Sequence, residues 1–310
     1  MSRSRGRGSM SILEYYELSS LDPVENLATE SRITEALAPG RRAVAVWRSR
    51  RSVVIGRHQN PWIECSVARM VRDGVELVRR PTGGGAVFHD PGNVNFSFIT
   101  SRDDHSTDRN LELVIAALGR FGVEAVRTTR HDIEYHGKKV SGNAFRHTAK
   151  TSLHHGTLLL DADLDALHAY LAASPAKFES KGIASVRSAV TNLREVAPTL
   201  SFEAFSGVLR ETVDAEFDVV SPPIPRFDVD LVKQYRSWDW VYGKTPRFSA
   251  IVETSSGAVE VSADKGRLRA PVLLAGRSVE FDHPAVAELL ELFPGLRLSE
   301  NMPKNASDGV

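Results

Sequence analysis

A run of three glycines beside paired arginines is the strongest sign of chemistry in this 310-residue chain. It reads Arg79-Arg80-Pro81-Thr82-Gly83-Gly84-Gly85-Ala86-Val87-Phe88-His89-Asp90. Consecutive glycines cost conformational entropy, but they let a backbone pass close to a ligand and turn several N–H groups toward one anion; Arg80 could meet a phosphate or a carboxylate there. The run lacks the Gly-Lys-Ser/Thr of a Walker loop and the spacing of a dinucleotide-binding loop. The alternative is a flexible β-turn whose glycines are only structural.

A lysine among acids is the second candidate, in the segment from residue 132 to residue 143. The dipeptide His136-Gly137 is a two-residue hairpin signal. With the turn there, Glu134 lies opposite Lys139 and residue 132 opposite residue 141, and opposed side chains share a face of the sheet. The side chains expected on that face are Asp132, Glu134, Lys139 and Ser141. They could bind a ligand; the alternative is a solvated face with cross-strand ion pairs.

Histidines, a tryptophan and the single cysteine are weaker candidates. His154 and His155 are neighbours in an expected strand, so they point to opposite faces and at most one can meet a given ligand; we expect structural roles. No HExxH or similar spacing occurs, so no metal ligand is assignable. Trp47 could line an apolar acyl pocket or simply lie in the core. Cys65 has no visible activating partner, which favours a quiet structural thiol.

The elements that must position these residues can be read from capping and alternation. The sequence Asp22-Pro23-Val24-Glu25 has the N-cap, first-turn proline and N3 acid of a helix start, and the helix should end near Leu37. Apolar runs predict strands at 43–47, 53–56, 75–79, 86–89, 94–99 and 153–160, and helices at 111–121, 164–173 and 202–217. Long strands, hairpins and packing helices indicate an α/β (α+β) domain with a mixed or antiparallel sheet.

The chain is expected to divide at the proline-rich linker Ser221–Pro225. We predict a tail at 1–13, a large catalytic domain at 14–220, a small accessory α+β domain at 226–300, and a second tail at 301–310. The small domain should contain strands at 258–262 and 268–272 and a helix at 284–292. Its separate mounting suggests a mobile lid.

Composition limits the classes of function. The 39 basic and 39 acidic residues cancel, which argues against bulk nucleic-acid binding. No apolar run approaches the ~20 residues that span a bilayer, and one cysteine excludes an intramolecular disulfide. The first ten residues hold Arg3, Arg5 and Arg7 and no acid. They fit a short mitochondrial transit segment or a disordered basic tail.

Five segments in order resemble the lipoate–protein ligase A family. They are Val54–Trp62, Arg79–Asp90, Lys139–Arg146, His154–Leu160 and Lys181–Leu193. The resemblance covers about residues 14 to 250, and segments 56–62 and 238–246 are also similar to the mitochondrial lipoyltransferases of animals. It implies a class II tRNA synthetase/biotin protein ligase-like catalytic domain with a mixed sheet, followed by a small C-terminal domain that is shorter than usual.

The resemblance also implies an activity. Lipoate and ATP, with Mg²⁺, would give lipoyl-AMP and pyrophosphate. The lipoyl group would then pass to a lysine of apo lipoyl domains in 2-oxoacid dehydrogenase E2 subunits or of the glycine cleavage H protein. The protein would be a monomer without nucleic-acid or membrane partners, in the mitochondrion or, if bacterial, in the cytoplasm.

Residue by residue, the family's invariant lysine falls on Lys139, and a site acid falls on Asp132; we expect these two to be catalytic. Trp47 matches a lipoyl-pocket tryptophan, and Thr82 stands where serine is frequent. The residues expected to bind substrate or nucleotide are Trp47, Arg80, Thr82, Gly83, Gly84, Gly85, Ala86, Phe88, His89, Ser141 and Gly142.

Other functions remain open from the sequence. A lipoyltransferase would use preformed lipoyl-AMP or a lipoyl-protein donor without ATP activation. An octanoyltransferase acting on acyl-carrier protein would also need no ATP, so pyrophosphate release separates it from a ligase. A non-catalytic module would bind lipoyl-adenylate or a lipoyl domain without modifying it.

Overall fold

The computed structural model describes residues 11–172, 176–186, 188–280 and 282–299. Residues 1–10 of the predicted tail at 1–13, including the expected transit segment, and the predicted tail at 301–310 lie outside the described residues. Residues 12 and 13 instead begin a strand. Within those residues, no helix combines the length and apolar character that crossing a bilayer requires.

A six-stranded mixed sheet organises the large part of the molecule, in the order β10-β11-β6-β2-β1-β13. Strand β1 pairs in parallel with β2 and β13, and the remaining pairs are antiparallel. The strands are β1 (Ile12–Glu17), β2 (Arg42–Trp47), β6 (Asn93–Ser101), β10 (Asn143–His147), β11 (Thr151–Leu159) and β13 (Asp218–Val220). A mixed sheet was expected and is confirmed.

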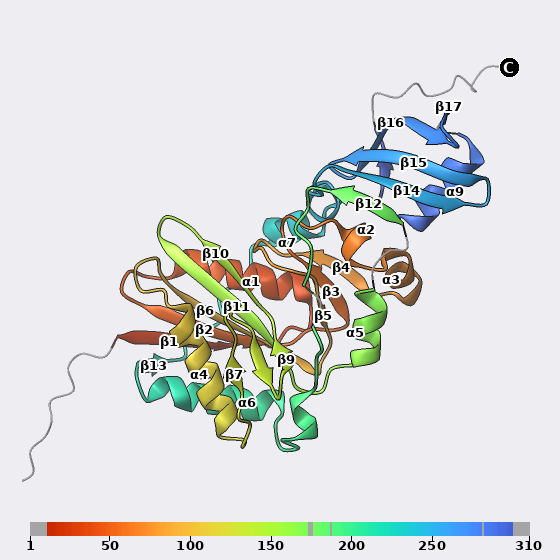
Figure 1. Ribbon diagram of the computed structural model, residues 1–310. Helices are drawn as coiled ribbons and strands as arrows, with labels where there is room; N and C mark the ends of the chain where they lie inside the picture. The colour runs from red at the N-terminus through yellow and green to blue at the C-terminus, as the bar shows by residue number, and fades with distance from the viewer. Residues whose placement is uncertain (1–10, 173–175, 187, 281, 300–310) are drawn as a thin grey trace, which may run out of the picture.

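Helices cover both faces of this sheet because its strands are apolar on both sides. Helices α4 (Thr107–Gly119) and α6 (Phe202–Asp214) pack on one face around Phe96, Leu111 and Phe205. Helix α1 (Pro23–Ala36) packs on the other face with Leu27 and Trp47. Figure 1 shows α4 and α6 side by side, away from α1.

Two small sheets and short helices lie beside the main sheet and carry the motifs singled out above. One has the order β4-β3-β5 and the other β7-β8-β9. Their strands are β3 (Ser52–Ile55), β4 (Glu76–Arg79), β5 (Val87–His89), β7 (Val126–Arg127), β8 (Ile133–Tyr135) and β9 (Lys138–Ser141). The helices nearby in the chain are α2 (Pro61–Glu64), α3 (Val67–Asp73), α5 (Leu164–Tyr170) and the 3₁₀ helix η1 (Leu193–Glu195).

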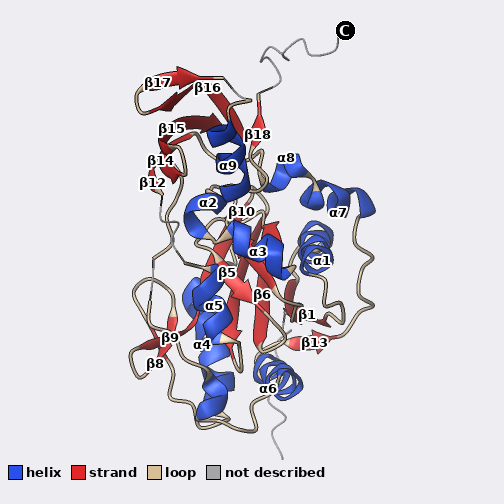
Figure 2. Cartoon of the chain, turned by 90° about the vertical axis from the view of Figure 1, so that its right-hand side faces the viewer, coloured by secondary structure: helices blue, strands red, loops and turns tan. Residues whose placement is uncertain are grey.

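The C-terminal part forms a second six-stranded sheet at one end of the molecule (Figures 1 and 2). It contains β12 (Lys177–Ser180), β14 (Phe248–Thr254), β15 (Gly257–Asp264), β16 (Arg267–Leu274), β17 (Arg277–Val279) and β18 (Arg297–Leu298), with helix α9 (Pro284–Leu292). Helices α7 (Val229–Arg236) and α8 (Trp238–Val241) precede it. Strand β12 comes from within the range predicted for the large domain, yet it pairs with β14. Because of this pairing, a domain boundary at 220–226 does not separate the two sheets. Whether each part folds independently stays a prediction.

The two parts share one apolar core. Trp62 and Phe88 belong to the same buried cluster as Phe248 and Leu289 of the C-terminal part. The Trp62 indole also donates a hydrogen bond of 3.0 Å to the carbonyl oxygen of Pro294. A continuous core of this kind is not what a separately mounted lid would show.

Arg79 ties the parts together with a buried cation. Its guanidinium is fully enclosed and donates to the carbonyl oxygen of Val241 at 2.8 and 2.6 Å, to the hydroxyl of Thr245, and to three carbonyl oxygens of the 56–59 loop. Burial lowers the pKa of Arg79 to about 10, so it stays charged at neutral pH. The sequence predicted no such role for Arg79.

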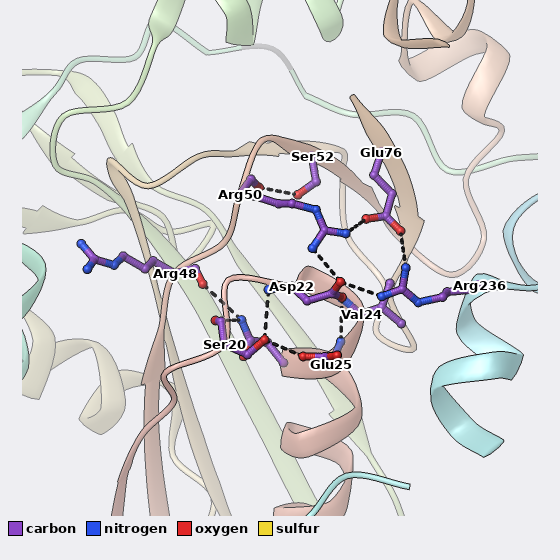
Figure 3. A network of polar contacts seen from close by, with 10 residues as sticks. Ser20, Asp22, Val24, Glu25, Arg48, Arg50, Ser52, Glu76 and Arg236 are labelled. Carbon is purple, nitrogen blue, oxygen red and sulfur yellow. Dashed lines mark hydrogen bonds and ion pairs between the residues drawn. The ribbon is translucent and has the colours of Figure 1, made fainter. Parts of the chain in front are cut away.

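Helix α7 is held by an ion-pair network at the surface (Figure 3). Asp22 accepts hydrogen bonds of 2.6 Å from both Arg50 and Arg236. Glu76 accepts from the same two arginines. Four segments distant in sequence thus meet at the start of α1. Burial would raise the pKa of Asp22, but hydrogen bonds from Arg50, the Glu25 amide and Arg236 outweigh it and lower that pKa.

Local signals in the sequence located several elements correctly. The Asp22 carboxylate caps α1 by accepting from the amides of Val24 and Glu25, and α9 spans residues 284–292 as expected. The turn at His136-Gly137 is also confirmed, with Glu134 opposite Lys139.

The predicted pairing of residue 132 with Ser141 is wrong. A register shift between Ile133 and Glu134 places Ile133 opposite Ser141. An extra residue of this kind in one strand re-aims the side chains beyond it. The simple alternation expected for Asp132, Glu134, Lys139 and Ser141 therefore does not extend past the bulge.

Candidate active site

A cavity of about 320 Å³ lies between the main sheet, the glycine-rich loop and the β8–β9 hairpin. Its apolar wall includes Leu27, Trp47 and Val54. The predicted residues that line it are Trp47, Arg80, Gly84, Gly85, Ala86, His89, Asp132, Lys139 and Gly142. We call this space the first cavity. The structure therefore gathers residues from four separated segments around one space.

A second cavity of about 670 Å³ adjoins the first. Phe88 and Ser141, both predicted site residues, line it with Leu159 and Leu167. The residues that line both cavities are Ala86, Val87, Lys139, Gly142, Thr157, Ala184, Ser185 and Val186. Lys139 thus stands where the two spaces meet. The predicted residues Thr82 and Gly83 line neither.

Lys139 is held in place by both its backbone and its side chain. Its amide donates to the carbonyl oxygen of Ala189 at 2.8 Å, and its carbonyl oxygen accepts from Thr191. Its ammonium group forms an ion pair of 2.9 Å with Asp132, and both side chains are largely buried. A cation fixed in this way can stabilise negative charge that develops on a ligand.

The glycine-rich loop is folded around Arg80. The Arg80 guanidinium donates to the carbonyl oxygens of Gly83 at 3.1 Å, Gly85 at 2.7 Å and Val54 at 3.1 Å. Burial lowers its pKa to about 10, so it remains charged at neutral pH. Most N–H groups of Arg80 already donate to carbonyl oxygens of the protein. Direct binding of a phosphate by Arg80 therefore stays a prediction.

The loop amides are available to a ligand. Gly84 adopts φ +83°, which favours glycine. Among the described residues, the amide N–H groups of Gly83, Gly84 and Gly85 have no acceptor. Successive free N–H groups in such a turn can hold an anion.

Buried polar atoms without partners also point to a ligand. The indole nitrogen of Trp47 and both ring nitrogens of His89 are enclosed without a hydrogen-bond partner among the described residues. The two rings meet edge to face at 5.8 Å between centroids. Burial lowers the pKa of His89 to about 3, so the ring is neutral at physiological pH. Buried polar groups without a partner are uncommon in native proteins. A bound ligand could supply the missing hydrogen bonds.

The paired histidines divide as strand geometry requires. His154 packs among Phe96, Phe98 and Phe145, which confirms its structural role. His155 lines the first cavity, so its structural assignment was incomplete. Cys65 is buried, and burial raises the pKa of its thiol, as expected of a quiet cysteine.

Sequence reasoning missed several residues of the site. Asn143 and Thr157 line the first cavity, and both lay inside quoted motifs without an assigned role. The segment Ile183–Val186, which we call the shared wall, lies in another quoted motif. Its Ser185 hydroxyl accepts from the amide of Ala86 at 2.9 Å and donates to Glu64. Only tertiary contacts reveal these roles.

No group of three or more histidine, cysteine, aspartate or glutamate side chains that could hold a metal ion occurs in the part of the chain that the structure describes.

Comparisons with known proteins identify the family of this chain. Residues 22–214 match the family model of the lipoyl protein ligase A/B catalytic domain. The lipoate-protein ligase A of Psychrobacter cryohalolentis is 41% identical over 247 residues, which cover 75% of this chain and 73% of that protein. Since this relative is bacterial, the similarity does not support the expected mitochondrial location.

Solved structures confirm the expected fold class. P. falciparum LipL1 in complex with lipoate superposes with a TM-score of 0.65 at 26% identity, covering 81% of each chain. The T. acidophilum protein Ta0514 with bound lipoic acid gives a TM-score of 0.62 at 25% identity, covering 75% of this chain and 98% of that one. On its motifs, its fold and its matched residues, the chain belongs to the lipoyl protein ligase A/B catalytic domain family.

Proposed function

We propose that the protein is a lipoate–protein ligase that activates lipoate with ATP and transfers the lipoyl group to a lysine of an acceptor protein. The observation that carries this proposal is the pair of cavities that meet at Lys139. A lipoyl-adenylate has two bulky ends joined by an acyl phosphate. Two adjoining spaces with a cation at their junction fit such a ligand.

Each cavity suits one end of the adenylate. The first offers Leu27, Trp47 and Val54 to an aliphatic chain, and burial of apolar surface supplies affinity. The second is larger and opens beside Ser141 and Phe88 of strand β5, with room for a nucleotide. Relatives with bound lipoate or lipoic acid support an acyl ligand for this fold.

Activation joins the acid to AMP. A carboxylate oxygen of lipoate attacks the α-phosphorus of ATP, a new P–O bond forms, and the bond to the leaving pyrophosphate breaks. Negative charge grows on the phosphoryl oxygens during this step. Lys139 and the free amides of Gly84 and Gly85 are donors of the kind that stabilise it.

Transfer uses the same junction. The acceptor amine, with an ordinary pKa near 10.4, must first lose a proton. Its nitrogen then attacks the acyl carbon, an amide bond forms, and the C–O bond to AMP breaks. Asp132, 2.9 Å from Lys139, orients that lysine and is a carboxylate that could take the proton. Water is the other candidate base.

Cofactor and partners follow from the proposed reaction. Magnesium would enter with ATP, held mainly by its phosphates as is common at nucleotide sites. The acceptors we propose are the lipoyl domains of 2-oxoacid dehydrogenase E2 subunits and the glycine cleavage H protein. We propose a monomer that acts in the bacterial cytoplasm.

One assay tests this function. The purified protein is incubated with lipoate, Mg-ATP and an apo lipoyl domain, and the acceptor is weighed by mass spectrometry while pyrophosphate is measured. We expect one lipoyl group per acceptor and stoichiometric pyrophosphate. A parallel reaction supplies lipoyl-AMP without ATP. If transfer occurs only from supplied lipoyl-AMP, the protein is a lipoyltransferase and not a ligase. If transfer occurs in neither reaction, the protein is a non-catalytic binding module.

A further inference from the structure

A chain of buried polar side chains runs from helix α1 to the glycine-rich loop, behind the first cavity. Glu30 is fully buried on α1 and accepts from Ser97 on strand β6. Its carboxylate lies 3.0 Å from Nδ1 of His155. The other ring nitrogen, Nε2, is 2.8 Å from the hydroxyl of Thr82. The Thr82 hydroxyl accepts from Nε of Arg80 at 3.0 Å.

The chemistry of these groups identifies the donor at each end of the series. A carboxylate only accepts, so Nδ1 of His155 donates to Glu30. Nε2 of His155 and the Thr82 hydroxyl share the next hydrogen bond. The Thr82 oxygen is left to accept from Arg80. Each buried group in the series is thereby satisfied, as buried polar networks require.

The arrangement has the order of a nucleophile–base–acid triad, but the hydroxyl cannot act as a nucleophile. Thr82 is about 1% exposed and does not line either cavity. Its hydroxyl faces Arg80, which in turn holds the carbonyl oxygens of Gly83 and Gly85. The Thr82 end of the series therefore acts on the loop and not on a substrate.

We propose that Glu30, His155 and Thr82 are positioning residues that fix Arg80 and so aim the free amides of the glycine-rich loop at the adenylate. This inference rests on the proposed function, because it takes the adenylate as the ligand of those amides. The Gly83 and Gly85 carbonyl oxygens accept from Arg80, whereas the amide N–H groups of the three glycines have no acceptor among the described residues. Loss of the Thr82 hydroxyl would free Arg80 and let the loop rotate.

The test compares Thr82→Val with Thr82→Ser in the full-length protein. Valine keeps the shape and removes the hydroxyl, which leaves buried donors and acceptors unpaired. We expect Thr82→Val to raise the KM for supplied lipoyl-AMP by roughly tenfold or more, with the KM for the acceptor domain unchanged. Thr82→Ser should restore the wild-type KM. Thr100→Val, which removes another buried hydroxyl whose bond is local, serves as the control.

This KM difference separates positioning from stability. A variant that merely unfolds loses active protein, which lowers the apparent kcat but leaves KM where it was. A Glu30→Gln change should also raise the KM, and the double variant with Thr82→Val should be non-additive because the groups act as a unit. If the wild type transfers, three outcomes would overturn the positioning role and leave the proposed function standing. These are an unchanged KM in Thr82→Val, a raised KM in Thr82→Ser, and additive effects in the double variant. A wild type that neither transfers nor binds a non-hydrolysable lipoyl-adenylate analogue would overturn the proposed function, and the inference with it.

Discussion

Lys139 reaches the junction of the two cavities through a hairpin whose turn could be read from two residues. His136-Gly137 predicted the turn, and both residues adopt positive φ there. The bulge next to Ile133 could not be predicted, because nothing local distinguishes it. Asp132 nevertheless reaches Lys139. At the residue scale, the place of a residue was therefore predictable where a motif was local, whereas its exact partners depended on the fold.

Replacing Lys139 with alanine should abolish most of the activity without unfolding the protein. Loss of one preorganised charge at a transition state lowers the rate by roughly 10²–10³, so both adenylation and transfer should fall by about that factor. Lys138→Ala is the matched control, because Lys138 is the exposed neighbour on the same strand. Rates are measured by pyrophosphate release and acceptor mass. A Lys139→Ala protein that turns over like the control would refute this role.

His89 should make the folded protein lose stability in weak acid. Its pKa is about 3 when folded and near 6.5 when unfolded, so between these values the unfolded chain binds the extra proton. The free energy of unfolding should therefore fall as pH drops from about 6.5 toward 3. Urea titrations at several pH values measure it, and His89→Gln should show a shallower decline. Parallel curves for the two proteins would contradict the assignment.

The glycine-rich loop is the element in which backbone conformation carries function. Three consecutive glycines predicted that the backbone passes close to another group. The structure shows two such close contacts, one to the Arg80 side chain and one to Gly56. A Cβ on Gly84 would lie 2.8 Å from the Arg80 guanidinium, whereas one on Gly56 would lie 2.2 Å from the Gly84 carbonyl oxygen. The loop is thus packed from behind by the protein, which the sequence alone could not show.

Gly84→Ala should weaken the binding of a lipoyl-adenylate analogue. The side chain strains a φ of +83° and pushes on Arg80, so the loop amides move, and we expect a Kd increase of about tenfold from ~1–2 kcal/mol of strain. Gly74→Ala is the control, since its φ is +69° with open space around it. Both variants should lose some stability, but only Gly84→Ala should lose affinity. Calorimetric titration decides, and equal affinities would favour a purely structural turn.

Elements with local signals were the ones that the sequence located. The capped helix α1 was found because its start signals lie within four residues. Strands β12 and β14 were missed, since each gains its pairing from a partner distant in the chain. Strand β10 was missed for a related reason: only its pairing with β11 defines it. Non-local pairing is the information that a single sequence does not display.

At the scale of the whole molecule, the C-terminal part behaves as a structural support for the site. Residues 226 onward supply two of the acceptors of the Arg79 guanidinium, the Val241 carbonyl oxygen and the Thr245 hydroxyl. They also supply Arg236, the partner of the Asp22–Glu76 network. They also complete the core around Trp62. The expectation of a mobile lid came from the proline-rich linker. Such a linker indicates a boundary between helices or strands, but it does not indicate how the residues after it pack.

Deleting residues 226–310 should therefore destabilise the large part. Each large apolar side chain left exposed costs about 1.5–3 kcal/mol, and Arg79 would lose the acceptors that Val241 and Thr245 provide. We expect an insoluble truncate or a melting temperature lower by more than about 10 °C. Circular dichroism and thermal melts measure this. A truncated protein that melts like the full-length chain and still transfers from lipoyl-AMP would support the mobile lid.

The pairing of β12 with β14 also sets an order of events during synthesis. Strand β12 ends at Ser180, and the shared wall begins at Ile183. Its partner β14 leaves the ribosome roughly seventy residues later, a wait of about 4–14 s at ordinary translation rates. All strands of the main sheet have emerged by then, since β13 ends at Val220. All strands of the central sheet are thus available for pairing before the strand that anchors β12, beside the shared wall, has been made.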